Sequence, residues 1–382
     1  MLRTHSHTQI GVLTKNTIPL ITPVIDHTIL CQHFVLLVSP DHSAQLPYIE
    51  HFLRQKDINL TVIPLESDLQ SLNHALKPYQ NSNIAINLSE GRPGITGQLL
   101  LWAKQHKQCA FWLNANTDKL RFLLPESTPP IPLADHICIP EFLALKGMIF
   151  QEGYRHLPSQ NQLLPLAAKW LTKAHSHRQA FQTLNWLSSS ANGLELTSLS
   201  CARHLWNKPH LQQLIRDLTD LNLVKKEGER RITFSDPTIA SFVRGGWLEY
   251  ACFSTLHQLK STRHDIQDIA LGVKIERQLQ GTSVINELDV IALVNNRLFL
   301  IECKTGKLSQ KPVLNQQTIY RLDSITELLG ESCHGFVVSL EPLGHQINTR
   351  ALEVGIHLLE GYDIKQLSQR IESIANGHNE HI

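Results

Sequence analysis

The sequence lacks the features that assign a chain quickly to a class of protein. None of its seven cysteines forms a CxxC pair, so neither a zinc knuckle nor a disulfide framework is indicated. An excess of one charge is lacking too, because 35 Lys and Arg balance 34 Asp and Glu, and any nucleic-acid binding must therefore use a local patch. No apolar run approaches the roughly 18 residues of a membrane span, and the first residues lack a secretory signal. We expect a cytoplasmic protein with no membrane partner.

The chain is long enough for more than one domain. Its 382 residues correspond to roughly two to three domains at about 150 residues each. Between residues 9 and 116, short apolar runs alternate with amphipathic stretches, which is typical of parallel βαβ units. The unbroken run FVLLV at 34–38 suits a strand buried on both faces. We predict an α/β fold in which residues 1–157 form a Rossmann-like ligand-sensing domain.

A helical pattern replaces the strand pattern in the middle of the chain. Helical spacing marks one face with Leu211, Leu214, Ile215, Leu218 and Leu221. The stretch that follows, LVKKEGERRITF, has two short extended runs around a Glu-Gly turn, and its basic residues are Lys225, Lys226, Arg230 and Arg231. Helices followed by such a hairpin resemble a winged helix-turn-helix, so residues 158–235 are predicted to form a winged-helix-like connector. The presumed recognition helix carries little positive charge, which favours a structural connector over a DNA reader.

Residues 286–304 predict a tight β-hairpin. Asn295 and Asn296 lie between two apolar runs, which indicates a two-residue turn. With that turn, Asp289 lies directly opposite Glu302. The alternation of side chains along a strand then places both acids on one face, and the opposite face is apolar.

The facing acids predict a metal site. Two carboxylates at roughly 5 Å between Cβ atoms repel each other unless a cation lies between them. Asp289 and Glu302 are therefore candidate ligands for Mg²⁺ or Mn²⁺, at metal-oxygen distances of about 2.0 to 2.2 Å. Lys304, on the same face, is placed to orient or help deprotonate an attacking water. The simpler alternative is a salt bridge between Lys304 and Glu287, which the same register places opposite each other, but it leaves the facing acids unexplained.

An Asp followed, after about a dozen residues, by Glu-x-Lys on a hairpin resembles the PD-(D/E)xK nuclease superfamily. The predicted order of helix, strand, hairpin, helix and strand around it is similar as well. The resemblance implies a restriction-endonuclease-like domain at residues 236–382, with Asp289, Glu302 and Lys304 as its catalytic set.

Two further elements carry this resemblance. Glu249, on the preceding predicted helix, matches the position at which many of these nucleases have another acid of the metal site. Gln316 and Tyr320, on the following predicted helix, match the Q-x-x-x-Y element of the RecB-like branch. The alternative is that all three are solvated residues on polar helix faces.

A second resemblance lies in the segment NLSEGRPGITG at 87–97. This segment follows the fourth predicted strand and is similar to the Asn-x-Ser/Thr-x-Gly-basic loop of CARF domains, which are Rossmann-like dimers that bind cyclic oligoadenylates. Its glycines let the backbone approach a ligand, and a helix N-terminus and Arg92 attract phosphate. Glu90 and Pro93 depart from the family pattern, and a plain strand-to-helix turn is the alternative. The candidate ligand contacts are Thr14, Lys15, Asn87, Ser89, Gly91, Arg92 and Thr96.

Together the three parts are similar to the single-chain CARF nucleases of type III CRISPR antiviral defence. The resemblance implies a homodimer activated by a cyclic oligoadenylate, with cyclic tetra-adenylate as the expected activator. It also implies Mn²⁺ or Mg²⁺ as cofactor, and DNA or single-stranded RNA as the substrate of an endonuclease. The rival interpretation is a non-catalytic, ligand-responsive DNA-binding regulator with a vestigial nuclease fold. The complete Asp, Glu and Lys set argues against this rival.

Overall fold

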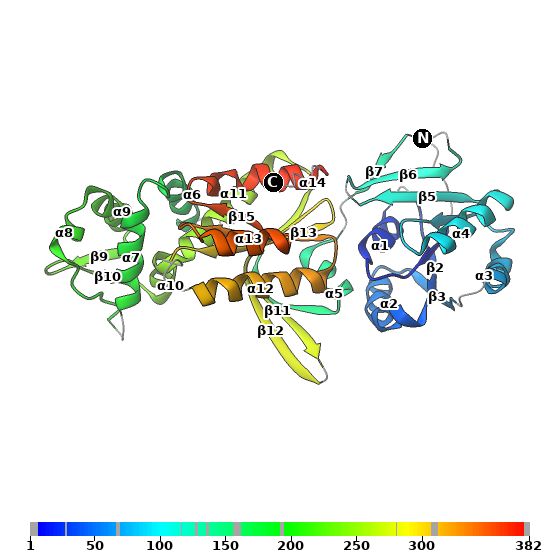
Figure 1. The fold of residues 1–382 in the computed structure, drawn as a ribbon, viewed down its shortest axis with the longest axis horizontal. Helices are drawn as coiled ribbons and strands as arrows, with labels where there is room; N and C mark the ends of the chain where they lie inside the picture. Colours follow the sequence, from blue (N-terminus) through cyan, green and yellow to red (C-terminus); the bar gives the residue numbers. More distant parts are fainter. Residues whose placement is uncertain are drawn as a thin grey trace.

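The computed structural model describes residues 7–26, 29–65, 69–115, 117–126, 129–134, 137–155, 162–191, 195–279, 281–306 and 312–377. These residues form a seven-stranded sheet, a six-stranded sheet and a two-stranded hairpin, arranged along an elongated molecule (Figure 1). Helices accompany both large sheets, so the predicted α/β fold class is confirmed. No helix within the described ranges is long and apolar enough to cross a lipid bilayer.

The N-terminal sheet is Rossmann-like. Its strand order is β3-β2-β1-β4-β5-β6-β7, parallel from β3 to β5 and antiparallel for the last two strands. Its strands are β1 (Thr8–Val12), β2 (His33–Val38), β3 (Asn59–Pro64), β4 (Ile84–Asn87), β5 (Cys109–Asn114), β6 (Lys119–Leu124) and β7 (Ile131–Pro132). Its helices are α1 (Ile18–Ile25), α2 (Leu46–Gln55), α3 (Leu69–Leu76) and α4 (Pro93–Gln105). The apolar run in β2 is buried from Phe34 to Leu37, as expected for a strand covered on both faces.

The middle of the chain is helical and ends in the predicted hairpin. Its elements are α6 (Leu163–Lys173), α7 (Arg178–Ser190), α8 (Arg203–Trp206), α9 (Pro209–Asp220), β9 (Val224–Glu227) and β10 (Arg231–Phe234). The predicted apolar stripe on α9 is buried at Leu211, Leu214, Ile215 and Leu218. On another side of α9, Asp217 accepts hydrogen bonds from Lys169 Nζ at 2.8 Å and Trp170 Nε1 at 3.1 Å, both on α6. These bonds join the buried side of α9 to α6, while His210, Arg216 and Asp220 of α9 are exposed.

The C-terminal sheet has the strand order β15-β14-β13-β12-β11-β8. Its strands are β8 (Met148–Tyr154), β11 (Ile266–Leu279), β12 (Thr282–Val294), β13 (Arg297–Lys304), β14 (Cys333–Ser339) and β15 (His357–Glu360). The helices of this part are α10 (Pro237–Ser241), α11 (Trp247–Thr262), α12 (Pro312–Leu329), α13 (His345–Glu353) and α14 (Leu367–Ala375). The strands β12 and β13 pair antiparallel, and β13 and β14 pair parallel.

The edge strand β8 comes from the sequence before the predicted domain boundary at residue 157. It pairs antiparallel with β11, and Phe150 lies opposite Ile275. The short helix α5 (Ile139–Leu145) precedes it and is joined to α2 by an ion pair of 2.6 Å between Glu141 and Lys56. Sheet pairing therefore crosses the predicted boundary, because an amphipathic strand of this length gives no sign of which sheet it joins.

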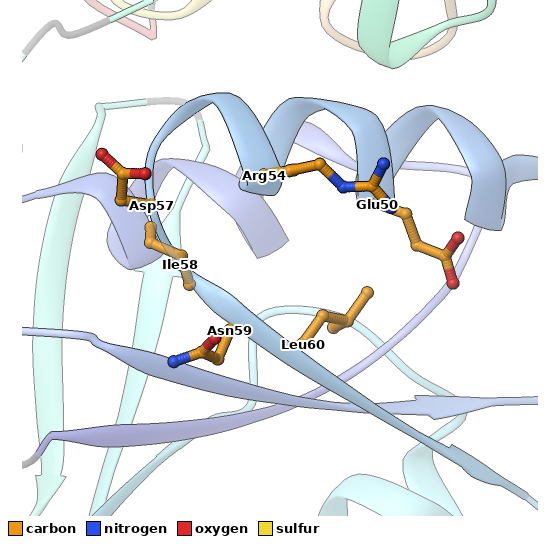
Figure 2. Close-up of a pocket in the computed structure, with 6 residues that line it drawn as sticks. All are labelled: Glu50, Arg54, Asp57, Ile58, Asn59 and Leu60. Carbon is orange, nitrogen blue, oxygen red and sulfur yellow. The ribbon is translucent and has the colours of Figure 1, made fainter.

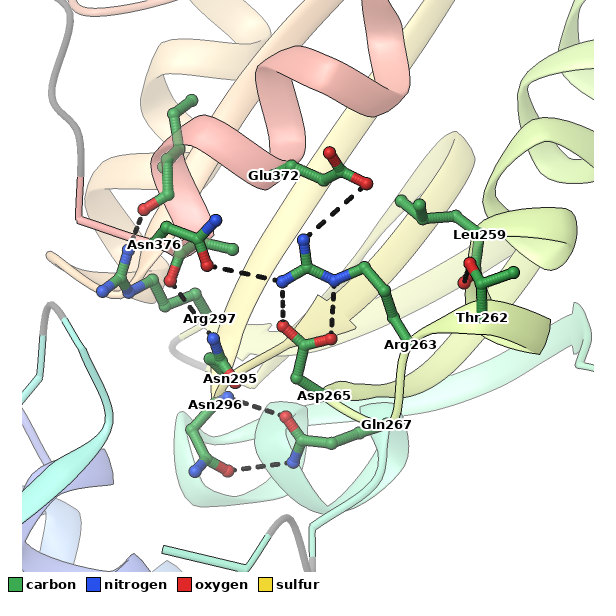
Figure 3. A network of polar contacts seen from close by, with 12 residues as sticks. Leu259, Thr262, Arg263, Asp265, Gln267, Asn295, Asn296, Arg297, Glu372 and Asn376 are labelled. Carbon is green, nitrogen blue, oxygen red and sulfur yellow. Dashed lines mark hydrogen bonds and ion pairs between the residues drawn. The ribbon is translucent and has the colours of Figure 1, made fainter. Parts of the chain in front are cut away.

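The hairpin turn between β12 and β13 is held from several sides (Figure 3). Both turn residues have positive φ, 47° at Asn295 and 57° at Asn296, as a two-residue turn with matching twist requires. Gln267 binds Asn296 twice, accepting from its backbone N–H at 2.7 Å and donating to its side-chain oxygen at 2.9 Å. The other side-chain atom of Asn296, Nδ2, donates to Asp118 of the N-terminal sheet at 2.7 Å. The turn is thereby tied to both large sheets.

We predict that Asn296→Ala lowers the free energy of unfolding by about 2 kcal/mol or more. The substitution removes buried hydrogen bonds to Gln267 and Asp118 and places a side chain that disfavours positive φ at this position. Urea titration of both proteins measures the change. As a control, Asn376→Ala removes only a contact of 3.5 Å with Arg263, so it should change stability by less than about 0.5 kcal/mol. Equal effects of the two substitutions would contradict this role of the turn.

Candidate active site

The predicted register of the hairpin is confirmed. Val294 pairs with Arg297, and the pairing continues without a shift to Val290 and Ile301. Asp289 and Glu302 are the next residues on their strands, so they project from the face opposite to the buried Val290 and Ile301. The carboxylate of Asp289 reaches across to β13, where Oδ2 accepts the backbone N–H of Cys303 at 2.6 Å.

Glu302 is the most buried carboxylate of the site, with 4% of its side chain exposed. Its Oε1 contacts two cations, Lys304 Nζ at 2.5 Å and Arg321 Nη2 at 2.5 Å. Its Oε2 is buried and has no hydrogen-bond partner in the described part of the chain. A bare carboxylate oxygen in such a place is costly unless a cation or donor joins it.

Glu249 completes a group of interacting acids. It lies in the first turn of α11. Burial, reinforced by the charges of Asp289 and Glu302, raises the pKa of Glu249 from 4.5 to about 8. Burial and then the charge of Glu302 raise the pKa of Asp289 from 3.8 to about 6. The negative charges of Glu249, Asp289 and Glu302 therefore act on one another within this buried site.

The acids fit a hard divalent cation. Within the described ranges, no group of three or more His, Cys, Asp and Glu side chains is already arranged as a complete metal site. Two protein carboxylates are nevertheless the usual contribution to Mg²⁺ or Mn²⁺ in sites that also use water and substrate phosphate. The unpartnered Glu302 Oε2 and the upward shift of the Asp289 pKa both mark missing positive charge. The predicted ligands therefore fit the ion.

The alternative salt bridge between Glu287 and Lys304 is absent. Lys304 instead contacts Glu302. Burial alone would lower the pKa of Lys304, but the charges of Glu302 and Asp289 outweigh it and raise this pKa. Glu287 lies on exposed β12 opposite Lys274 of β11. The pairing of β12 with β13 ends at Val290, whereas β12 pairs with β11 from Val294 to Thr282. The prediction that extended the β13 pairing to Glu287 was therefore wrong.

Among the described residues of α12, the one that contacts the acids is Arg321, and not the predicted Gln316 or Tyr320. Gln316 is half-buried and Tyr320 is exposed. The ring of Tyr320 lies 5.0 Å from the guanidinium carbon of Arg350 on α13. Arg321 reaches Glu302, and sequence reasoning missed it because the Q-x-x-x-Y pattern directs attention to its neighbour.

The candidate ligand loop lies between β4 and α4. Gly91 has φ of +124°, and a Cβ there would meet Thr96 Cγ2 at 3.0 Å, so this position suits glycine. Asn87 is buried and donates to the Pro19 carbonyl at 3.1 Å. Ser89 Oγ accepts the backbone N–H of Leu113 at 2.8 Å. Asn87 and Ser89 thus hold the loop within the fold.

Other candidate contacts remain at the surface. Lys15 is exposed, and Arg92, the residue before α4, has 83% of its side chain exposed and forms a long contact of 3.5 Å with Asp41. Thr14 donates to Glu90 at 2.5 Å. The loop around Thr14 also contacts the residue that follows α5, because Lys146 Nζ donates to the Lys15 carbonyl at 3.4 Å.

A separate pocket lies between α2 and the start of β3 (Figure 2). Its lining residues are Glu50, Arg54, Asp57, Ile58, Asn59 and Leu60. None of them is a predicted site residue, so this pocket adds nothing to the acid cluster or the ligand loop.

We predict that Glu249→Gln changes how stability depends on pH. With a folded-state pKa near 8, Glu249 retains a proton that the unfolded chain releases near pH 4.5, so the wild-type unfolding free energy falls as pH rises between these values. Glu249→Gln has no carboxyl group to titrate here. Its free energy of unfolding, relative to that of wild type, should therefore rise by about 1 kcal/mol or more between about pH 5.5 and pH 8.5. Urea midpoints in EDTA provide the measurement. Glu229→Gln, at an 86% exposed side chain, should follow the wild-type curve, and a Glu249→Gln protein that does so too would contradict the burial of this acid.

The C-terminal part matches a family of nuclease domains. Residues 236–376 match the family model described as Card1-like, endonuclease domain. The matched span contains all four acidic and basic residues predicted for catalysis. No curated protein sequence matches the chain significantly.

Solved structures match the chain over nearly its whole length. The protein VC1899 from Vibrio cholerae is 25% identical, with 97% of this chain and 99% of that chain covered and a TM-score of 0.85. Can2 from Sulfobacillus thermosulfidooxidans, solved in complex with cyclic tetra-adenylate, is 19% identical, with 97% of each chain covered and a TM-score of 0.77. A type III CRISPR defence DNA nuclease activated by cyclic oligoadenylate is 17% identical, with 96% of this chain and 52% of that chain covered and a TM-score of 0.56. Residues 236–376 are therefore similar to Card1-like endonuclease domains, and the chain as a whole has the fold of the CARF-domain CRISPR nucleases that its sequence resembles.

Proposed function

We propose that this protein is a metal-dependent endonuclease of type III CRISPR defence, activated by a cyclic oligoadenylate and cleaving DNA, single-stranded RNA or both. The observation that carries the proposal is the buried pair Asp289 and Glu302 with the bare Oε2 of Glu302. A match to an endonuclease domain over the same residues supports it.

Each residue of the site has a distinct proposed role in phosphodiester hydrolysis. Asp289 and Glu302 would hold Mn²⁺ or Mg²⁺, which supplies Lewis-acid stabilisation of the phosphate. Lys304, pinned to Glu302 at 2.5 Å, keeps its positive charge at neutral pH and is positioned to orient the attacking water. Glu249, whose pKa is about 8, can hold a proton or a water hydrogen at the edge of the site.

The activator is proposed to bind the loop at 87–96 and the neighbouring Thr14 and Lys15. This loop precedes the 13-residue helix α4, whose N-terminal amides favour an anion. The similarity in fold to Can2, solved with cyclic tetra-adenylate, supports that compound as the activator. To shift the ratio of active to inactive protein from 1:99 to 99:1, the activator must bind the active state about 5.5 kcal/mol more favourably than the inactive state. One loop cannot supply this, whereas two copies on a two-fold axis double each contact, so we propose a homodimer with one activator.

The rival function, a DNA-binding regulator, has less support. A winged-helix reader contacts DNA phosphates with basic residues around its recognition helix. The exposed residues of α9 include Asp220 as well as Arg216, so this helix carries little net positive charge. A vestigial nuclease has no need to keep Asp289, Glu302 and Lys304 together, so the complete set favours an enzyme.

We predict that Asp289→Asn, Glu302→Gln or Lys304→Ala each abolishes cleavage while activator binding is retained. The three side chains serve one metal and one water, so a double variant should lose no more activity than either single variant. Supercoiled plasmid and labelled single-stranded RNA with Mn²⁺, each with and without a panel of cyclic oligoadenylates, provide the assay. Cleavage that needs one cyclic oligoadenylate is the expected wild-type result. Glu302→Gln cutting at the wild-type rate would refute the site assignment.

We predict that Arg92→Glu raises the activator concentration needed for half-maximal cleavage by more than about tenfold, since it replaces attraction to phosphate with repulsion. The maximal rate should stay near that of wild type, because the acid cluster is untouched. Lys104→Glu, at the far end of α4, is the matched control with the same charge change. Calorimetry should find one activator per two chains. One activator per chain, or equal effects of the two variants, would place the ligand elsewhere.

A further inference from the structure

Arg321 is the residue of α12 that enters the acid cluster. Its Nη2 contacts Glu302 Oε1 at 2.5 Å. Its Nη1 donates to the backbone carbonyl of Glu287 on β12 at 2.9 Å. The guanidinium therefore bridges α12 to both strands that carry the catalytic acids, and it is 38% exposed.

The two contacts of Arg321 differ in what a metal ion would do to them. The hydrogen bond from Arg321 Nη1 to the Glu287 backbone carbonyl has an uncharged acceptor, so a change of charge at the carboxylates should alter it little. The Glu302 contact is an ion pair at the carboxylate that would also hold the metal, and Lys304 Nζ already lies 2.5 Å from the same oxygen. A divalent cation on Glu302 therefore weakens the attraction between that carboxylate and Arg321.

A substrate phosphate offers the displaced donor a new partner. The guanidinium presents several N–H groups in a plane that matches two oxygens of a phosphate. A nucleic-acid backbone that approaches a metal on Asp289 and Glu302 brings non-bridging oxygens to the same side of the hairpin. The partly exposed side chain can reach them with a small rotation around the fixed Nη1 contact.

We propose that Arg321 binds the substrate phosphate in this site. In the metal-free protein its Nη2 neutralises Glu302. With metal and substrate present, Nη2 transfers to a non-bridging phosphate oxygen while Nη1 keeps the Glu287 carbonyl. This inference rests on the proposed nuclease function and adds to it a residue in contact with the substrate.

The test separates metal binding from nucleic-acid binding. Mn²⁺ affinity is measured by electron paramagnetic resonance on activator-bound protein without nucleic acid. Oligonucleotide affinity is measured by fluorescence anisotropy in a Lys304→Ala background, which binds without cutting, with Mn²⁺ and again in EDTA. Arg321→Gln is compared with Arg350→Gln on α13, an arginine with a similar exposed fraction, 37% of its side chain, that contacts Tyr320 and Glu353 instead of the acids.

Arg321→Gln should bind Mn²⁺ severalfold more tightly, because a competing cation is gone. It should bind the oligonucleotide about tenfold or more weakly with Mn²⁺, and with a much smaller loss in EDTA. Arg321→Lys keeps the positive charge but lacks the planar guanidinium with its several N–H groups. Its oligonucleotide affinity should lie between those of wild type and Arg321→Gln. Arg350→Gln should match wild type in both measurements.

Other outcomes overturn the inference. Unchanged oligonucleotide affinity in Arg321→Gln with Mn²⁺ would exclude phosphate contact. Weaker binding of both Mn²⁺ and oligonucleotide, with a lower melting temperature, would show that Arg321 only holds α12 against the hairpin. If Arg321→Gln does not fold, wild-type oligonucleotide affinity in Arg321→Lys would overturn the proposal in the same way. The proposed function fails separately, if wild type neither cuts nor binds nucleic acid under any activator while remaining folded.

Discussion

The two-residue turn at Asn295 and Asn296 sets the register on which the acid cluster depends. Adding or removing one residue would move Asp289 to the apolar face and abolish its approach to Glu302. The turn is fixed by its left-handed backbone and by Gln267, and also by Asp118 and the Ala115 carbonyl, which bind Asn296 and Arg297 from the N-terminal sheet. The N-terminal domain thus contacts the hairpin that carries Asp289 and Glu302 at its turn, away from the two acids themselves.

The charges of the acid cluster are partly balanced within the chain. Glu249 and Asp289 lie with Glu302 in a buried place, where lost solvation and then repulsion between the acids raise the pKa of Glu249 and of Asp289. Lys304 and Arg321 compensate part of this charge by sharing a single oxygen of Glu302. Their concentration on Oε1 leaves Oε2 bare, so the compensation also keeps one ligand position available.

Local patterns predicted the hairpin well and its surroundings less well. The Asn-Asn signal and the strand alternation predicted the pairs from Val294–Arg297 to Val290–Ile301, because register follows from the turn alone. Asp289 and Glu302 lie just beyond the last of these pairs. Glu287 was assigned to the wrong neighbour because the ladder between β12 and β13 ends at Val290, while β12 pairs with β11 along its whole length, and where a ladder ends depends on tertiary packing. Arg321 was missed for a similar reason, since contact between a helix and a strand depends on how the helix is rotated over the sheet. Asn87 matched a ligand motif in sequence, yet its amide is used inside the fold.

The edge strand β8 limits how the chain can be divided. The matched endonuclease domain begins at residue 236, but its sheet includes Met148–Tyr154 from well before that point. A fragment that starts at 236 would leave one side of β11 without its backbone partner and expose the apolar Ile275 to water, a state prone to aggregation. Recombination that exchanges N-terminal domains among such proteins would therefore preserve this sheet only with a junction before β8, so that β8 and the helical connector travel with the C-terminal domain as one heritable unit.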